Sequence, residues 1–194
     1  MRTSIRIVFF LLTVFIMAAC SGDSNGMGSD GDNEIITPPG TMSASFNGAT
    51  WTSISVAAST TTSGTTYVGV GVAGVSGSFD GVALAVADLT GISEKVYTFP
   101  NSVNNTLVLG ISSTTDPAAE ATFDPTRSTA TVEITSFDLI NGVVSGTFSG
   151  NLYKTIDGSL VELRNGVFNQ IPLTGIPKNT DVKTMLLDLE TNLK

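Results

Sequence analysis

The sequence predicts an all-β domain, folded as an antiparallel β-sandwich or a flattened barrel of roughly eight to ten strands. Two observations carry this prediction. Short runs rich in Val, Thr, Ile and Phe alternate between apolar and small or polar residues, which is the period of a strand with one buried face. Asn-Gly and Asp-Gly pairs separate these runs, and such pairs suit hairpin turns whose central residues need positive φ.

Four runs show the alternation most clearly. Their apolar members are Val68, Val70 and Val72; Val82, Leu84 and Val86; Leu107, Leu109 and Ile111; and Ala130, Val132 and Ile134. In the first two runs the opposite face carries only small residues: Gly69, Gly71 and Ala73 in the first run, and Ala83, Ala85 and Ala87 in the second. Such a small-residue face either lets another layer pack closely or leaves room for a ligand.

Five pairs mark the predicted turns: Asn47-Gly48, Asp80-Gly81, Asn141-Gly142, Asp157-Gly158 and Asn165-Gly166. The last pair also fits a bulge within one long strand. Residues 116–127 contain two Asp-Pro steps, Asp116-Pro117 and Asp124-Pro125, and are predicted to form a loop.

The first nineteen residues read as a signal peptide, because Arg2 and Arg6 precede an apolar run that ends in small residues. The run is shorter than the ~20 residues of a membrane span. Met17, Ala18, Ala19 and Cys20 resemble the lipobox of a bacterial lipoprotein. The resemblance implies cleavage before Cys20, the only cysteine, and its lipidation. Ser21 then favours the outer membrane, with the periplasmic and the external orientation both open.

Four segments follow from these patterns. Residues 1–19 are the signal peptide, and residues 20–41 are the lipidated cysteine and a flexible polar tether. Residues 42–173 are the all-β domain. Residues 174–194 are a C-terminal extension, predicted to form a short helix because its apolar residues follow helical spacing: Val182, Met185, Leu186, Leu189 and Leu193.

The charge of the chain argues against nucleic acid as a partner. The formal net charge is −8, and removal of Arg2 and Arg6 leaves 7 basic against 17 acidic residues, or −10. Nucleic-acid binding relies on Lys and Arg to neutralise phosphates. No nucleic-acid partner is therefore expected. The predicted lipidation implies attachment to the membrane, and an envelope protein or glycan is the further expected partner.

The sequence contains no histidine, which excludes Ser-His-Asp triads and histidine-bound zinc. Paired carboxylates are not excluded, and they would suit glycan hydrolysis if two of them met about 5 to 9.5 Å apart. The candidates are Asp80, Asp88, Glu133, Asp138 and Glu162. Nothing in the sequence brings any two of them together.

Three further patterns were weighed. Residues 69–74 match Gly-x-Gly-x-x-Gly, but strand and turn residues follow instead of a helix, so we interpret the match as a glycine-rich strand. Residues 30–34 resemble the start of a calcium loop, but Ile35 stands where the loop requires a glycine and no bidentate acid follows, so we interpret them as a solvated linker. Two sets of candidates remain open: calcium ligands at Asp116, Glu120 and Asp124, and ligand contacts at Trp51, Tyr67, Tyr97 and Tyr153, with Trp51 expected to help close the core.

Short motifs in the domain resemble those of an uncharacterised envelope lipoprotein family common in Bacteroidota. They are Phe46-Asn47-Gly48 with Trp51, Gly146-Thr147-Phe148-Ser149-Gly150, Asn165-Gly166-Val167-Phe168-Asn169, and Ile171-Pro172-Leu173. The resemblance covers residues 42–173. It implies a lipidated start, a polar tether and an all-β domain, and it brings no activity and no catalytic residues.

Three functions are compatible with these observations. The first is a membrane-anchored, non-enzymatic binding or structural module of the envelope, and we predict it from the tether, the all-β domain and the absence of histidine. The second is a carrier that holds a small apolar ligand within a curled sheet. The third is a glycan hydrolase that uses paired carboxylates. No cofactor and no metal are predicted.

Overall fold

A computed structural model describes residues 37–174, except residues 79 and 101–103. This part of the chain is all-β, as predicted, and contains eleven strands and one short 3-10 helix. The elements are β1 (Thr41–Phe46), β2 (Ala49–Thr52), β3 (Ser55–Ser63), β4 (Thr66–Val75), β5 (Asp80–Asp88), β6 (Lys95–Phe99), β7 (Asn105–Ser113), η2 (Pro117–Ala119), β8 (Ala121–Thr122), β9 (Ala130–Asp138), β10 (Val143–Lys154) and β11 (Leu160–Thr174).

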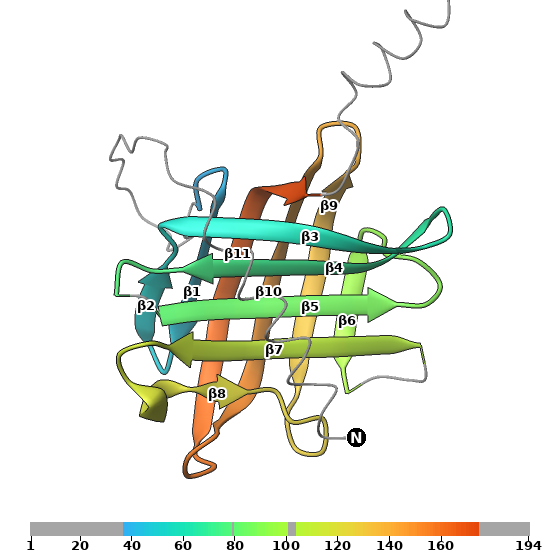
Figure 1. The fold of residues 1–194 in the computed structure, drawn as a ribbon. Helices are drawn as coiled ribbons and strands as arrows, with labels where there is room; N and C mark the ends of the chain where they lie inside the picture. Colours follow the sequence, from blue (N-terminus) through green and yellow to red (C-terminus); the bar gives the residue numbers. More distant parts are fainter. Residues whose placement is uncertain (1–36, 79, 101–103, 175–194) are drawn as a thin grey trace, which may run out of the picture.

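All the strands belong to one sheet, in the order β2-β1-β11-β3-β4-β5-β7-β8-β10-β9-β6. An additional pairing of β10 with β11 closes this sheet into a ring of seven strands, from which β1–β2 and β9–β6 extend. The ring is flattened into two layers whose strands run across each other, with β3, β4, β5, β7 and β8 in front (Figure 1). Of the two predicted architectures, the flattened barrel describes this arrangement.

The two layers are joined at corners that involve very few residues. At one corner the end of β11 pairs in parallel with β3, through Leu173 with Ala58 and Thr174 with Ser59. At the other corner β8 contributes two residues, which pair with β7 on one side and β10 on the other. All strand pairings except that of β11 with β3 are antiparallel.

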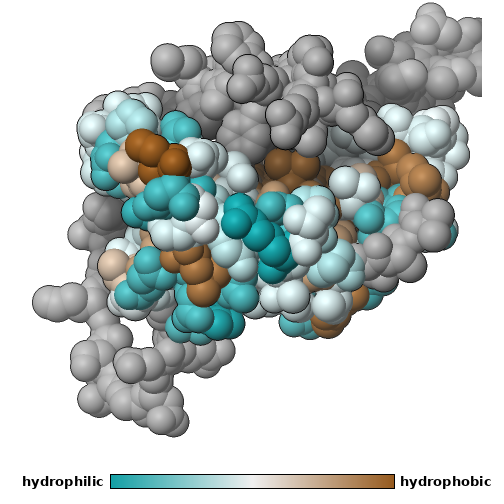
Figure 2. Space-filling model, turned by 90° about the horizontal axis from the view of Figure 1, so that it is seen from below, coloured by the Kyte–Doolittle hydropathy of each residue, from teal (hydrophilic) through white to brown (hydrophobic). Residues whose placement is uncertain are grey.

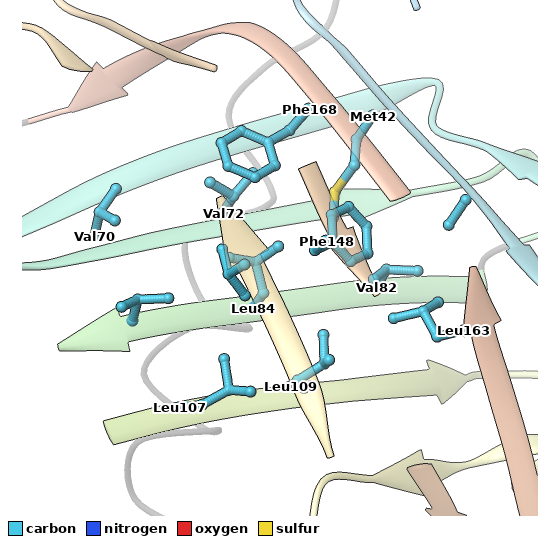
Figure 3. Close-up of a cluster of buried hydrophobic side chains, with 14 of the residues drawn as sticks. Met42, Val70, Val72, Val82, Leu84, Leu107, Leu109, Phe148, Leu163 and Phe168 are labelled. Atoms are coloured by element: carbon cyan, nitrogen blue, oxygen red, sulfur yellow. The ribbon is translucent and has the colours of Figure 1, made fainter. Parts of the chain in front are cut away.

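The core fills the space between the layers with side chains from both. Val72, Leu84 and Leu109 point inward from the front layer, and Phe148 and Phe168 meet them from the back layer (Figure 3). All of them are at most 3 % exposed. In β5 and β9 the residues that alternate with the core residues are half-buried or exposed, which confirms the period-two pattern there. In β4, by contrast, residues 69–74 are all buried.

Two glycine–phenylalanine pairs lock β10 against β11. Gly146 pairs in register with Phe168, and Phe148 pairs with Gly166. Each phenylalanine ring lies over the opposite glycine, because a Cβ on Gly166 would fall 2.6 Å from the Phe148 ring and a Cβ on Gly146 would clash with the Phe168 ring. The two rings lie 6.3 Å apart, centroid to centroid. A side chain at either glycine would displace an aromatic ring of the core.

The predicted turns are only partly correct. Asn47 and Gly48 both have positive φ, at 47° and 87°, as a two-residue type I′ hairpin requires. Gly142 and Gly158 have positive φ within longer loops. Asp80-Gly81 is not the turn between β4 and β5: it begins β5, where Gly81 pairs with Val75 and the Asp80 carbonyl accepts from the Ser76 amide.

Asn165-Gly166 is a bulge rather than a turn. The register of β10 against β11 shifts between Phe148 and Gly150, and Asn165 has a φ of 51°. Residues 160–174 therefore form one bent strand. The glycine-rich residues 69–74 lie wholly within β4, so the strand interpretation is confirmed. The predicted signal peptide, the lipobox, most of the tether and the C-terminal helix lie outside the described residues.

Candidate functional site

The site lies where β8 is too short to cover the edge of β7. β8 pairs only with Gly110 and Ile111, the next residue along the chain, Phe123, bonds to the Leu109 carbonyl, and the edge of β7 continues beyond them at Leu107 (Figure 1). A groove of about 870 Å³ follows this uncovered edge. It is therefore built by the corner of the barrel and not by a separate loop domain.

The groove combines an apolar lining with a polar rim. Its apolar lining consists of Phe99, Leu107, Leu109 and Phe123, and the first three are core residues that are at most 7 % exposed. The opposite rim comes from the segment after β8 and from the end of β10, and its polar members are Thr122, Asp124, Arg127, Tyr153, Lys154 and Thr155. Figure 2 looks onto this end of the molecule, where apolar residues form separate patches between hydrophilic ones.

Arg127 and Tyr153 form one stacked unit on the rim. The guanidinium carbon of Arg127 lies 3.9 Å from the centroid of the Tyr153 ring. Arg127 Nε also donates to Asp124 Oδ2 at 2.9 Å. Hydrogen bonds from Thr126 lower the pKa of Asp124, and Arg127 adds to this effect. The stack presents a flat cation–aromatic surface at the mouth of the groove.

Lys154 is the second cation at the groove. It forms no salt bridge with another described residue, whereas Lys95, Arg127 and Arg164 each do. Hydrogen bonds from Ser159 lower the pKa of the neighbouring Asp157, with a smaller Coulombic contribution from Lys154. Two of the four cationic side chains within residues 37–174 thus lie at one groove of an acidic protein.

A smaller hollow of about 430 Å³ lies around the β1–β2 hairpin. Trp51 and Asp80 line it, but Trp51 is only 7 % exposed and its indole Nε1 donates to the backbone oxygen of Asp80 at 3.1 Å. The Trp51 ring packs at a tilt against Phe46, with 6.1 Å between centroids. Trp51 therefore belongs to the core, and its ring is not an exposed surface on which a ligand could stack in this hollow.

The four predicted aromatic contacts are not gathered on one surface. Tyr97 is buried, and its hydroxyl accepts from the Ser93 amide and donates to the Ser93 carbonyl. Tyr67 is half-buried and packs edge-on against Phe137, with 5.9 Å between centroids. Of the four, only Tyr153 lines the larger groove.

No two of the five candidate carboxylates lie opposite each other in the strand register. Asp80 and Asp88 stand at opposite ends of β5, roughly 26 Å apart at strand spacing. In register, Glu133 lies opposite Thr147, Asp138 opposite Val143, and Glu162 opposite Asn151. Asp88 is buried and ion-paired with Lys95, and Asp138 accepts hydrogen bonds within its own turn. These positions give the paired-carboxylate hypothesis no support.

The acids in residues 116–124 serve the local backbone. Asp116 Oδ1 accepts from the Ala118 amide at 2.9 Å and caps η2, while Asp124 Oδ1 accepts from Thr126. The structure does not show the three acids converging on one point. Within the described residues, no group of three or more Asp, Glu, His or Cys side chains is placed to hold a metal ion.

Comparison with known families identifies the domain that carries this groove. A family described as a domain of unknown function, DUF6252, matches residues 39–172. The chain belongs to the DUF6252 family. The DUF6252 domain thus includes all the residues that form the groove.

Further comparisons add no named relative to the DUF6252 domain. No curated protein and no solved structure matches the chain. Within the described residues, no helix is long and apolar enough to cross a membrane.

Sequence reasoning missed most of the DUF6252 groove. It placed Tyr153 among the candidate contacts but singled out neither Arg127 nor Lys154. One signal was present, because Asp124-Pro125 marks the point where a strand paired with β7 must stop. The pairing of β8 with β7 itself is a contact between distant segments, and no local pattern reveals it.

Proposed function

We propose that the chain is a lipid-anchored lipoprotein of the cell envelope whose DUF6252 domain binds an envelope partner through the β7 groove, without catalysing a reaction. The groove carries this proposal. It is a large hollow with an apolar lining, a cation–aromatic stack and a lysine that has no salt bridge within the described residues. Such a combination of apolar area and a few polar groups is typical of binding sites.

The proposed anchor is Cys20, which would attach the domain to the outer membrane of a bacterium of the Bacteroidota. The lipobox pattern at residues 17–20 and the following polar tether support it. A tether of about twenty residues has a root-mean-square reach of roughly 25 Å, which leaves the groove accessible above the head groups. Several acyl chains would make the attachment durable, because one chain alone binds marginally.

The carrier alternative has less support than the binding module. Its ligand was expected within the curled sheet, but Phe148, Phe168 and the aliphatic side chains of both layers occupy the space between the layers. The hollow of suitable size lies outside that core, at the corner of the barrel.

The proposal is tested in cells in two steps. Growth with an alkyne-labelled fatty acid should label the wild-type chain and leave Cys20→Ser unlabelled and released from the membrane fraction. A photo-reactive benzoylphenylalanine in place of Thr155, on the groove rim, should then cross-link the membrane-bound chain to a protein or glycan. The same group in place of Thr62, exposed at the end of β3, is the matched control.

Each step can fail on its own. Labelled Cys20→Ser would refute the anchor. Cross-linking that is absent from position 155, or equal at positions 155 and 62, would refute the groove as the binding site.

A further inference from the structure

Successive residues of β7 direct their backbone amides and carbonyls alternately toward β5 and toward the edge on the β8 side. The Leu89 amide donates to the Asn104 carbonyl, which fixes the antiparallel register of β5 against β7. In that register Thr106 and Val108 bond to β5, and the amides and carbonyls of Leu107 and Leu109 point to the opposite edge. The Phe123 amide donates to the Leu109 carbonyl at 2.8 Å, which confirms the direction.

The chain that follows β8 forms hydrogen bonds with this edge of β7 only as far as Phe123. Continuing the register of β8 against β7 would place Pro125 opposite Leu107. Proline has no amide hydrogen to donate, so the ladder ends there. Thr126 and Arg127 instead bond to Asp124 and turn the segment away. The Leu109 amide and both backbone groups of Leu107 are left facing the groove, with no described residue bonded to them.

The charge on the groove rim favours an anionic partner. Arg127 and Lys154 line the groove together with one carboxylate, Asp124; Lys154 also borders the smaller hollow and contributes to the lowered pKa of Asp157. Arg127 is held by Asp124 and by the Tyr153 ring, whereas Lys154 has no salt bridge within the described residues. A carboxylate on the partner would complete an ion pair with Lys154.

We propose that the groove binds an extended peptide segment that adds to β7 as a further strand and places a carboxylate side chain at Lys154. This inference rests on the proposed function and names the chemistry of its partner. The peptide backbone bonds to the amide and the carbonyl of Leu107 and to the Leu109 amide, since the Leu109 carbonyl already accepts from Phe123. This is β-strand addition, as at other open sheet edges. Its alternate side chains lie against the apolar lining formed by Phe99 and Phe123.

The test uses the full chain in detergent and three synthetic hexapeptides with capped ends, measured by fluorescence anisotropy. The first alternates threonine and valine and carries one aspartate. The second is the same peptide with N-methyl groups on the amides of one edge, and the third has lysine in place of aspartate. We expect the first peptide to bind at least tenfold more tightly than either of the other two.

Two variants test the role of the lysine. Lys154→Gln should weaken the first peptide three- to fivefold and leave the third unaffected or tighter. Arg164→Gln removes the same charge from β11, outside the groove, and should change neither. Thermal unfolding of both variants should match the wild type, which separates lost binding from lost folding.

Several outcomes overturn the inference. They are no binding of the first peptide, equal binding of the N-methylated peptide, and equal binding of the lysine peptide. If the cross-link from position 155 persists in cells while the first peptide fails, the groove still binds a partner and only strand addition is wrong. If both the cross-link from position 155 and the binding of the first peptide fail, the proposed function is wrong as well.

Discussion

Asp88 is a buried carboxylate that holds the loop after β5 in place. Its side chain is 2 % exposed and accepts a hydrogen bond from Lys95 Nζ at 2.6 Å. Thr90 donates to Asp88 Oδ1 through both its amide and its hydroxyl. Burial by itself raises the pKa of Asp88, but the hydrogen bonds from Lys95 and Thr90 outweigh burial and lower this pKa below 3.8. The hydrogen bond to Asp88 raises the pKa of Lys95 above 10.5.

The pair predicts a pH-dependent stability. Because the folded pKa of Asp88 is lowered, its contribution is present above 3.8 and is lost as the pH falls through the folded value. The contribution of Lys95 is present below 10.5 and is lost as the pH rises through its raised pKa. At neutral pH, Asp88→Asn should lower the free energy of unfolding by about 1 to 2 kcal/mol, since Lys95 is partly exposed and can be solvated.

Urea unfolding at a series of pH values measures this effect. The difference between wild type and Asp88→Asn should shrink as the pH falls below 3.8, while Glu133→Gln, at an exposed position of β9, should stay near the wild type throughout. A difference that is constant from neutral to acid pH would show that the carboxylate charge is not what stabilises the loop.

At the scale of single residues, the sequence predicted the core better than the site. Alternation marked Val72 and Leu84 as buried, and Trp51 was expected to help close the core. The contact between Arg127 and Tyr153 could not be predicted from the sequence, because the two residues are 26 positions apart and meet only in the folded chain.

At the scale of elements, the Gly-Thr-Phe and Asn-Gly-x-Phe motifs have a shared structural role. They place Phe148 over Gly166 and Phe168 over Gly146 across β10 and β11. This pairing fixes the two longest strands, whose contact closes the barrel. The motifs are therefore explained by packing.

Gly166→Ala should consequently destabilise the fold. The new Cβ would lie 2.5 Å from the Phe148 carbonyl oxygen and 2.6 Å from its ring, and backbone atoms cannot move aside as a flexible side chain can. We expect a loss of about 1 to 3 kcal/mol, the usual cost of overpacking a core. Denaturant unfolding measures the loss.

Gly77→Ala is the matched control, since no atom lies within 4 Å of the Cβ it would add. It should change stability by no more than about 0.5 kcal/mol. Equal stability of the two variants would contradict the glycine–phenylalanine lock.

Element prediction succeeded for strands and failed for the turn at Asp80-Gly81, while at Asn165-Gly166 the structure has the bulge, one of the two predicted alternatives. Strands follow from alternation, which burial on one face imposes on every residue. An Asn-Gly or Asp-Gly pair shows only where the backbone can adopt positive φ. Whether the chain reverses there, as at Asn47-Gly48, or bends within a strand, as at Asn165-Gly166, depends on the strand packed alongside.

At the scale of the whole molecule, the groove exists because the barrel closes imperfectly. β10 and β11 pair along most of their length. Between β7 and β10, by contrast, only the two residues of β8 connect the strands. The sequence predicted a closed or layered all-β domain, but the order of strands around the seam depends on pairings between distant segments. The groove could therefore not be predicted before the fold was known.

The uncovered edge of β7 is the claim on which the groove and its proposed partner depend, and amide hydrogen exchange measured by NMR tests it most directly. The amides of Thr106 and Val108, bonded to β5, should exchange slowly. Those of Leu107 and Leu109, on the same strand, should exchange at least a hundredfold faster. Equal protection of all four amides would show that the edge is already covered and would contradict the account.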